Sequence, residues 1–174
     1  MNSNLTISLF GNPNCGKTAV FNLLTGLNQK VSNYPGITVE KKIANFKIDN
    51  INVSLEDYPG AYSLTPQSLD EKIVFEALIG WLNPDTAKPD AIVYVVDVTN
   101  LRRNLYFLSQ ILTFKIPVIL LLNMSDLVDT NQIVDYKLLK ENFSLYDVIP
   151  FSAAKETGYN KLLNCFKTLI KEKP

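Results

Sequence analysis

The chain has 174 residues, with 17 Lys and Arg against 17 Asp and Glu, and it contains no histidine. A single domain is expected at this length, because one core typically serves roughly 100 to 200 residues. The balanced charge gives no reason to expect nucleic acid as a partner. The lack of histidine excludes histidine metal ligands, histidine general bases and most triad chemistry.

Cysteine usage and hydropathy indicate a soluble chain in a reducing, cytosolic setting. Cys15 and Cys165 are the only cysteines, and they lie far apart without metal-ligand spacing. The N-terminus has no signal-type apolar region. The strongest apolar run, Ile116 to Leu122, is far shorter than the roughly 20 residues that span a bilayer.

The first third of the chain begins with a strand, a helix and a long polar connection. An alternating apolar run over 5–10 predicts the strand, and helical spacing follows over 19–24. The connection over 25–36 is rich in Gly, Asn, Ser and Pro, and loops of this length in compact domains are commonly functional. Residues 37–48 and 51–56 then alternate apolar and polar side chains around a turn, which predicts a β-hairpin.

The rest of the chain alternates helices with strongly apolar strands. A sharp break at 57–60 and a polar stretch over 61–68 precede the next elements. The strands expected over 91–96 and 117–122 are wholly apolar, as is typical of strands buried on both faces. The other expected elements are helices over 69–82, 100–114 (capped by Thr99 or Asn100), 133–143 and 159–171, and a strand over 147–151.

This order of elements predicts an α/β fold, in which a mostly parallel six-stranded sheet is covered by helices on both faces. In such sheets, ligands bind at the carboxyl ends of the strands. Each polar motif described below follows a predicted strand.

The stretch GNPNCGKT at 11–18 matches the phosphate-binding pattern G-x-x-x-x-G-K-[ST] and lies between a predicted strand and a predicted helix. Glycines at both ends allow consecutive N–H groups to turn toward an anion, and the helix N-terminus points at the same place. Lys17 adds a positive charge for the outer phosphates, and the Thr18 hydroxyl suits a magnesium ion. The nucleotide is also expected to contact Asn12, Pro13, Asn14, Cys15, Gly16 and Ala19.

Three later strand ends carry further site residues. Asp57 offers a carboxylate for the magnesium site, and Gly60 offers a backbone N–H for a terminal phosphate. In the stretch Asn123-Met124-Ser125-Asp126, the Asp126 carboxylate can accept hydrogen bonds from two adjacent donors of guanine, a pair that adenine does not present. The small residues Ser152, Ala153 and Ala154 let backbone N–H groups reach the base carbonyl.

Together these motifs resemble those of the GTP-binding (G) proteins over residues 4–171, and they are most similar to the cytosolic G domain of the ferrous iron transport protein B (FeoB) family. The stretches that carry this resemblance are GNPNCGKT at 11–18, SNYPGITVE at 32–40, DYPGAYSLTP at 57–66 and NMSD at 123–126. The resemblance implies a Ras-like P-loop fold that binds GTP or GDP with Mg²⁺.

The resemblance also implies roles for individual residues. Lys17 would contact the β- and γ-phosphates, Thr18 and Thr38 would reach magnesium, and Asp57 would hold a metal-bound water. Asn123 and Asp126 would read guanine. Asn14 would either coordinate a potassium ion beside the phosphates or simply brace the loop. Lys17, Thr38, Gly60 and Asn14 are thus the candidate catalytic residues.

Two departures from the general G-protein pattern bear on mechanism. Ala61 stands where many G proteins carry a glutamine that orients the attacking water, so slow intrinsic turnover is expected. Met124 stands where lysine is common; a thioether can still cover a base, and the strictness of guanine over adenine selectivity stays open.

The loops at 27–38 and 58–68 are expected to be switches that γ-phosphate and magnesium order and that hydrolysis releases. Thr38 and Gly60 would supply the difference in free energy between the two states. Tyr34, in the first loop, would pack over nucleotide, meet a partner or contribute only local packing.

The predicted function is that of a slowly hydrolysing regulatory GTPase domain, residues 1–174, at the cytoplasmic face of the inner membrane in a bacterial ferrous iron transporter. The resemblance implies helical and transmembrane parts beyond Pro174, and small accessory iron-transport proteins as further partners. Two alternatives stay open: a soluble GTPase of ribosome assembly or tRNA modification, and a nucleotide-sensing module with little hydrolysis.

Overall fold

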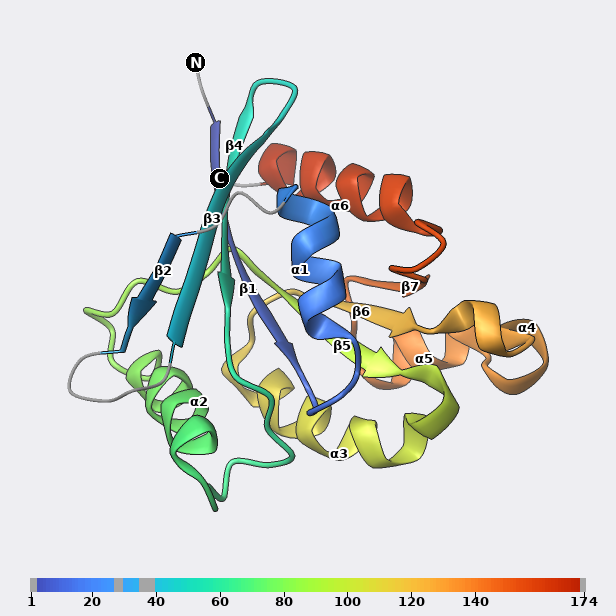
Figure 1. Cartoon of the computed structure of the whole chain (residues 1–174), viewed down its shortest axis with the longest axis horizontal. Helices are drawn as coiled ribbons and strands as arrows, with labels where there is room; N and C mark the ends of the chain where they lie inside the picture. Colours follow the sequence, from blue (N-terminus) through green and yellow to red (C-terminus); the bar gives the residue numbers. More distant parts are fainter. Residues whose placement is uncertain (1–2, 27–29, 35–39, 173–174) are drawn as a thin grey trace.

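The computed structural model describes residues 3–26, 30–34 and 40–172, which form one seven-stranded sheet with helices on both faces (Figure 1). The strand order across the sheet is β2-β3-β4-β1-β5-β6-β7. The strands are β1 (Ser3–Gly11), β2 (Lys30–Asn33), β3 (Glu40–Ile48), β4 (Ile51–Asp57), β5 (Ala91–Asp97), β6 (Val118–Asn123) and β7 (Asp147–Pro150).

The sheet is mostly parallel, as predicted. β1 lies between β4 and β5 and is parallel to both, and β5, β6 and β7 continue in the same direction. Among the strands of the described residues, only the pairs β2–β3 and β3–β4 are antiparallel, and β3–β4 is the predicted hairpin. A strand buried between parallel neighbours must be apolar on both faces, which explains the continuous apolar runs of β5 and β6.

The prediction of six strands was wrong, because β2 lies within the connection expected over 25–36. Its sequence, KVSN, has one apolar side chain and no alternation. β2 is an edge strand that pairs with β3 from Lys30 opposite Ile43 to Asn33 opposite Glu40. Main-chain hydrogen bonds to a neighbour, rather than side-chain pattern, therefore define this strand.

Two layers of helices cover the sheet. α1 (Lys17–Thr25) and α6 (Tyr159–Glu172) cover one face, while α2 (Leu69–Gly80), α3 (Leu101–Ile111) and α5 (Tyr136–Asn142) cover the other (Figure 1). In β5, alternate residues enter the two cores: Ala91, Val93 and Val95 on the α1 and α6 side, and Ile92, Tyr94 and Val96 on the other.

The helix expected over 133–143 is α5, and a separate short helix, α4 (Thr130–Ile133), ends where the expected segment begins. Asp129 and Asp135 each cap the helix that follows, because their carboxylates accept hydrogen bonds from the N–H groups of Asn131 and Leu138. The Asp135 cap therefore starts α5 at Tyr136 rather than at residue 133, a local signal that the apolar spacing does not show.

The helix expected over 100–114 is built from three pieces. These are the 3-10 turn η1 (Val98–Asn100), α3 and the 3-10 turn η2 (Leu112–Phe114). Asn100 occupies the N-cap position of α3 but makes no side-chain capping bond, whereas the Asp97 carboxylate caps η1 by accepting from the Thr99 N–H. Asn100, one of the two residues expected to cap this helix, is therefore its N-cap by position, although its side chain makes no capping hydrogen bond.

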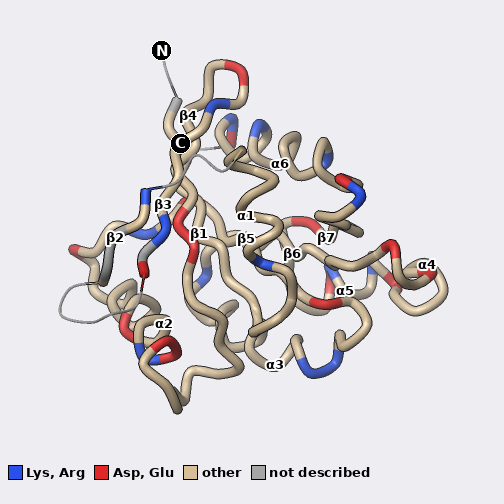
Figure 2. The backbone as a smooth tube through the Cα atoms, in the orientation of Figure 1, with Lys and Arg blue, Asp and Glu red and all other residues tan. Residues whose placement is uncertain are grey.

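Charged residues of both signs are interspersed along the described chain (Figure 2). None of the helices in residues 3–26, 30–34 and 40–172 combines the length and the apolarity needed to cross a membrane.

Candidate nucleotide-binding site

Three loops that follow separate strands meet at one edge of the sheet. The N–H of Ala61, after β4, donates to the main-chain oxygen of Gly11 at 3.2 Å. The Asn123 side chain, at the end of β6, donates from Nδ2 to the main-chain oxygen of Cys15 at 2.9 Å. Asn123 Oδ1 accepts from the N–H of Ala153, after β7, at 3.2 Å. The motifs predicted at separate strand ends therefore form one site around the phosphate loop.

The glycines of the phosphate loop are required by close contacts. A Cβ on Gly11 would lie 2.5 Å from the main-chain oxygen of Val95 on the neighbouring strand. Gly16 has φ +83°, and a Cβ there would lie 2.3 Å from Asn123 Nδ2. Asn14 is exposed and also adopts positive φ, 64°. The loop thus turns sharply at two residues and then enters α1 at Lys17, with free helical N–H groups at the turn.

Lys17 and Asp57 form an ion pair at the centre of the site. Nζ of Lys17 donates to Oδ1 of Asp57, and the two side chains are only 11% and 8% exposed. Burial raises the pKa of Asp57 above its ordinary value, and the Lys17 ammonium opposes that rise. A buried cation and a buried carboxylate are therefore held together beside the phosphate loop.

A hollow of about 470 Å³ opens at this point. It adjoins a second hollow between Lys17 and β3, with which it shares Lys17, Thr18 and Asp70. The first is lined by Asn12, Pro13, Asn14, Gly16, Lys17, Thr18, Gly60 and Asp70. The second also contains Glu40, Lys42, Asp57 and Pro59. The sequence prediction did not include Asp70, Glu40 or Lys42.

The donor set suits magnesium rather than a metal held wholly by protein. In the described parts of the chain, no group of three His, Cys, Asp or Glu side chains gathers as metal ligands. Magnesium is usually bound by one or two carboxylates together with substrate phosphates and waters. Asp57 and the Thr18 hydroxyl, which share the second hollow, fit that pattern.

A backbone hydrogen bond joins the two loops expected to surround the base. Ser125 N–H donates to the main-chain oxygen of Phe151 at 3.0 Å, which joins the β6 and β7 loops. Met124 adopts φ 62°, and its Cε lies 3.7 Å from where a Cβ on Gly16 would be. Asp126 is exposed on the 3-10 turn η3 (Ser125–Leu127). Ser152 is buried and accepts from Lys155 N–H at 3.1 Å, and Ala154 is exposed.

The segment after β4 approaches the phosphate loop closely. A Cβ on Gly60 would lie 2.9 Å from Pro13 N and 3.0 Å from Pro13 Cα. Ala61 is fully buried, and its N–H is taken by Gly11. Residue 61 therefore offers neither a polar side chain nor a free N–H to a water molecule.

Three polar residues that sequence reasoning missed hold the loop over 58–68. Glu71 of α2 accepts from Tyr62 N–H at 3.3 Å and from Gln67 N–H at 2.8 Å. Gln110 of α3 accepts from Leu64 N–H at 2.9 Å, and the Arg103 guanidinium lies 4.5 Å from the Tyr62 ring centroid. The spacing of Ser68 and Glu71 is a capping-box signal that could have identified Glu71 from sequence.

Two of the predicted residues, Tyr34 and Thr38, belong to the loop over 27–38. Thr38 lies outside the described residues. Tyr34 is half-buried, and burial together with the nearby Glu56 and Asp57 carboxylates raises its pKa above the ordinary tyrosine value.

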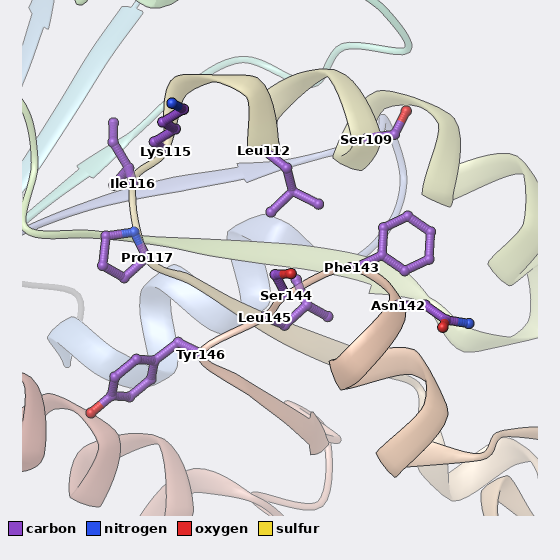
Figure 3. Close-up of a pocket in the computed structure, with 10 residues that line it drawn as sticks. All are labelled: Ser109, Leu112, Lys115, Ile116, Pro117, Asn142, Phe143, Ser144, Leu145 and Tyr146. Carbon is purple, nitrogen blue, oxygen red and sulfur yellow. The ribbon is translucent and has the colours of Figure 1, made fainter.

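A larger hollow, of about 750 Å³, lies at the opposite edge of the sheet, before the starts of β6 and β7 (Figure 3). Leu112, Phe143 and Leu145 make much of its wall apolar. No carboxylate lines it, and Lys115 is its one cationic residue. An apolar wall without carboxylates does not suit a magnesium-bound triphosphate. This hollow also contains none of the predicted site residues.

A phosphate loop that follows β1, a carboxylate at the end of β4 and an Asn-x-x-Asp stretch that begins at the end of β6, on this sheet, define a Ras-like P-loop nucleotide-binding domain. Within that class, the chain belongs to the ferrous iron transport protein B family, whose N-terminal family model matches residues 5–166. Membership of this family confirms the resemblance inferred from the sequence.

Individual relatives agree with the family assignment. The chain is 39% identical over 165 residues to the Fe(2+) transporter FeoB of Leptospira biflexa, which covers 94% of this chain and 22% of the relative. It is 44% identical over 163 residues to FeoB of Escherichia coli K12, covering 91% of this chain and 20% of that protein. The chain therefore spans about a fifth of the length of the curated relatives it matches.

Among solved structures, the G domain of the T. maritima FeoB iron transporter matches with a TM-score of 0.81 and 35% identity, over 95% of this chain and 98% of that one. A GDP-bound mutant of the S. thermophilus FeoB G-domain matches with a TM-score of 0.78 and 39% identity, over 92% of this chain and 59% of the other.

Proposed function

We propose that this chain binds GTP and GDP with Mg²⁺ and hydrolyses GTP slowly, as a regulatory domain of a ferrous iron transporter. The observation that carries the proposal is the meeting of Lys17, Asp57 and Asn123 around the phosphate loop. The GDP-bound state of a relative of the same fold supports guanine nucleotide as the ligand.

At the phosphate end of the site, different residues bind the phosphates and the Mg²⁺ ion. Lys17 leaves Asp57 to contact the β- and γ-phosphates, and Gly60 presents its N–H to the terminal phosphate. Thr18, Thr38 and Asp57 would hold Mg²⁺, Asp57 through a bound water, and the ion would neutralise charge on the phosphates. The pairing of Lys17 with Asp57 keeps both charges compensated when neither group contacts its ligand.

Guanine recognition is assigned to Asp126, with Asn123 bracing the site and Met124 covering the base. Calorimetry with GDP, GTP, ADP and ATP tests this assignment. Asp126→Asn should weaken GDP binding at least tenfold, because one of two carboxylate acceptors becomes a donor. Asp85→Asn, an exposed change between α2 and β5, is the matched control. Equal affinity of the unaltered chain for ADP and GDP would refute the role of Asp126.

Slow hydrolysis is proposed because residue 61 cannot orient water. Either a backbone group or a potassium ion held by Asn14 takes that task. Phosphate release measured in potassium and in sodium, with Asn14→Ala alongside, separates the two. A rate that is the same in both salts would remove potassium from the proposal.

Ala61 also supports a second candidate, a nucleotide-sensing module with little hydrolysis. Phosphate release in a single turnover distinguishes the two, since a sensing module retains bound GTP. Thr38→Ala should leave GDP affinity nearly intact and impair hydrolysis if loop 27–38 is a switch. If GDP affinity and the hydrolysis rate fell equally, loop 27–38 would not be a switch.

The longer relatives support a further proposal, that the domain acts with helical and transmembrane parts of a transporter and with small accessory proteins. Cells that depend on the full-length protein for ferrous iron should lose iron uptake when Lys17→Ala is introduced, if nucleotide state controls transport. Unchanged uptake would separate this domain from iron movement. Family membership speaks against the soluble ribosome or tRNA GTPase.

A further inference from the structure

Hydrogen bonds through the core connect the phosphate loop with α3. Tyr94, in the middle of β5, is fully buried, and its hydroxyl lies 3.0 Å from Asn12 Oδ1 and 3.1 Å from the main-chain oxygen of Asn104, two acceptors that share its one proton. Asn104 Nδ2 donates to the main-chain oxygen of Asp97 at 3.2 Å. The second residue of the phosphate loop is therefore tied to the first turn of α3 and to the end of β5.

These polar groups lie in an otherwise apolar layer. Asn12 and Asn104 are only 2% and 4% exposed, and the Phe107 ring packs edge-on against Tyr94 with centroids 6.0 Å apart. Phenylalanine at position 94 would fill the same space without the cost of burying a hydroxyl. Burial raises the pKa of Tyr94 well above its ordinary value, so the hydroxyl stays protonated and able to donate.

The other side of α3 holds the segment after Gly60. Gln110 accepts from the N–H of Leu64, and Arg103 lies over the ring of Tyr62. The helix α3 is thus connected both to the phosphate loop and to the segment after Gly60, the two parts of the protein expected to contact a terminal phosphate. Asn104 lies on the same helix as Arg103 and Gln110, so the spacing between these contacts is fixed and a shift of one displaces the others.

We propose that Tyr94 and Asn104 are positioning residues for GTP hydrolysis, which hold the phosphate loop in register with the Gly60 segment through α3. This inference rests on the proposed GTPase function. GDP lacks the γ-phosphate, so its binding depends on the phosphate loop and not on the register with Gly60. Loss of the Tyr94 hydroxyl should therefore separate hydrolysis from GDP affinity.

Tyr94→Phe tests the proposal by removing one oxygen atom and keeping the ring. The expected result is a fall in kcat of about fivefold, with GDP affinity changed by less than about twofold, as fits one lost hydrogen bond. Tyr146→Phe is the matched control, because its hydroxyl bonds Glu172 at the opposite edge of the sheet. An unchanged kcat, or equal losses of kcat and GDP affinity, would overturn the proposal.

Two further measurements separate positioning from simple loss of stability. Hydrogen exchange should quicken at the Ala61 and Leu64 amides in Tyr94→Phe, about 30 positions from the change, whereas a purely local role would spare them. In a double-mutant cycle, Tyr94→Phe and Gln110→Ala should reduce kcat by less than the product of their separate effects. Independent, fully multiplying effects would refute a shared path through α3.

Measurements on the unaltered chain distinguish failure of the proposed GTPase function from failure of the positioning role of Tyr94. If it binds GDP but releases no phosphate from GTP, the proposed GTPase function fails before the variants are compared. If it hydrolyses GTP and Tyr94→Phe does so equally well, only the positioning role fails. Gln110→Ala changes an α3 side chain outside the apolar core, so it keeps the exchange test usable if Tyr94→Phe does not fold.

Discussion

The side-chain amide of Asn123 donates to the main-chain oxygen of Cys15, 108 positions earlier in the chain, at 2.9 Å. The same amide accepts from Ala153 N–H, so one buried side chain fixes the phosphate loop against the loops that follow β6 and β7. The phosphate end and the base end of the site are thereby parts of one hydrogen-bonded unit.

Asn123→Ala should destabilise the fold and weaken nucleotide binding together. It leaves two main-chain groups without their partner, which predicts a loss of about 3 kcal/mol in the free energy of unfolding. GDP affinity should fall at least tenfold, measured by calorimetry. Asn131→Ala, an exposed change on α4, should leave both quantities unchanged. A variant that lost affinity but kept full stability would contradict the bracing role.

Gly60→Ala should abolish most hydrolysis without unfolding the chain. Its Cβ would meet backbone atoms of Pro13 at 2.9 and 3.0 Å, so the segment must move away from the phosphate loop. A displacement near 1 Å can reduce a rate about 100-fold. Gly80→Ala, at the end of α2 with no atom within 4 Å, should be neutral or stabilise by up to about 1 kcal/mol. Equal GTPase rates in the two variants would count against the close approach.

Glu71→Ala should loosen the loop over 58–68. The carboxylate accepts from two N–H groups of this loop, and its removal should cost about 1–2 kcal/mol of stability and speed amide exchange at Tyr62 and Gln67. Glu76→Ala, which removes an exposed ion pair with Lys72 on the same helix, should cost less than about 0.5 kcal/mol. Amide exchange that is equally slow in both variants would refute the role of Glu71 in holding this loop.

The two thiols should react slowly and with a shifted pH profile. Burial raises the pKa of both Cys15 and Cys165 to about 11. Labelling of the folded protein by a thiol reagent should still rise between about pH 10 and 11, where an ordinary cysteine is already almost fully ionised. A plateau near pH 10 would contradict the buried thiol environment.

The raised thiol pKa values also make the free energy of unfolding depend on pH. The folded pKa of each thiol is raised, so the unfolded chain loses its thiol protons first as pH rises. The stabilising contribution is therefore complete below pH 9, the ordinary value, and declines as pH rises toward about 11. In denaturant titrations, Cys15→Ala should lessen this decline.

Much of the fold followed from local patterns. The hairpin, the buried parallel strands and the helix layers were predictable because alternation, apolar runs and helical spacing are set by which faces each segment buries. β2 was not, since a short polar edge strand is defined by its neighbour's main chain. The start of the helix expected over 133–143 was misplaced, because the Asp135 cap begins α5 at Tyr136 and periodicity does not detect such a cap.

The sequence by itself determined the chemistry of this protein: a phosphate loop at 11–18, carboxylates at Asp57 and Asp126, and no polar side chain at position 61. Only the tertiary structure decided how these groups are held. It paired Lys17 with Asp57, placed Asn123 between Cys15 and Ala153, and joined Asn12 through Tyr94 to α3. Motifs are local and can be read along the chain, whereas these bonds join residues ten to more than a hundred positions apart, which only the packing of strands and helices brings together.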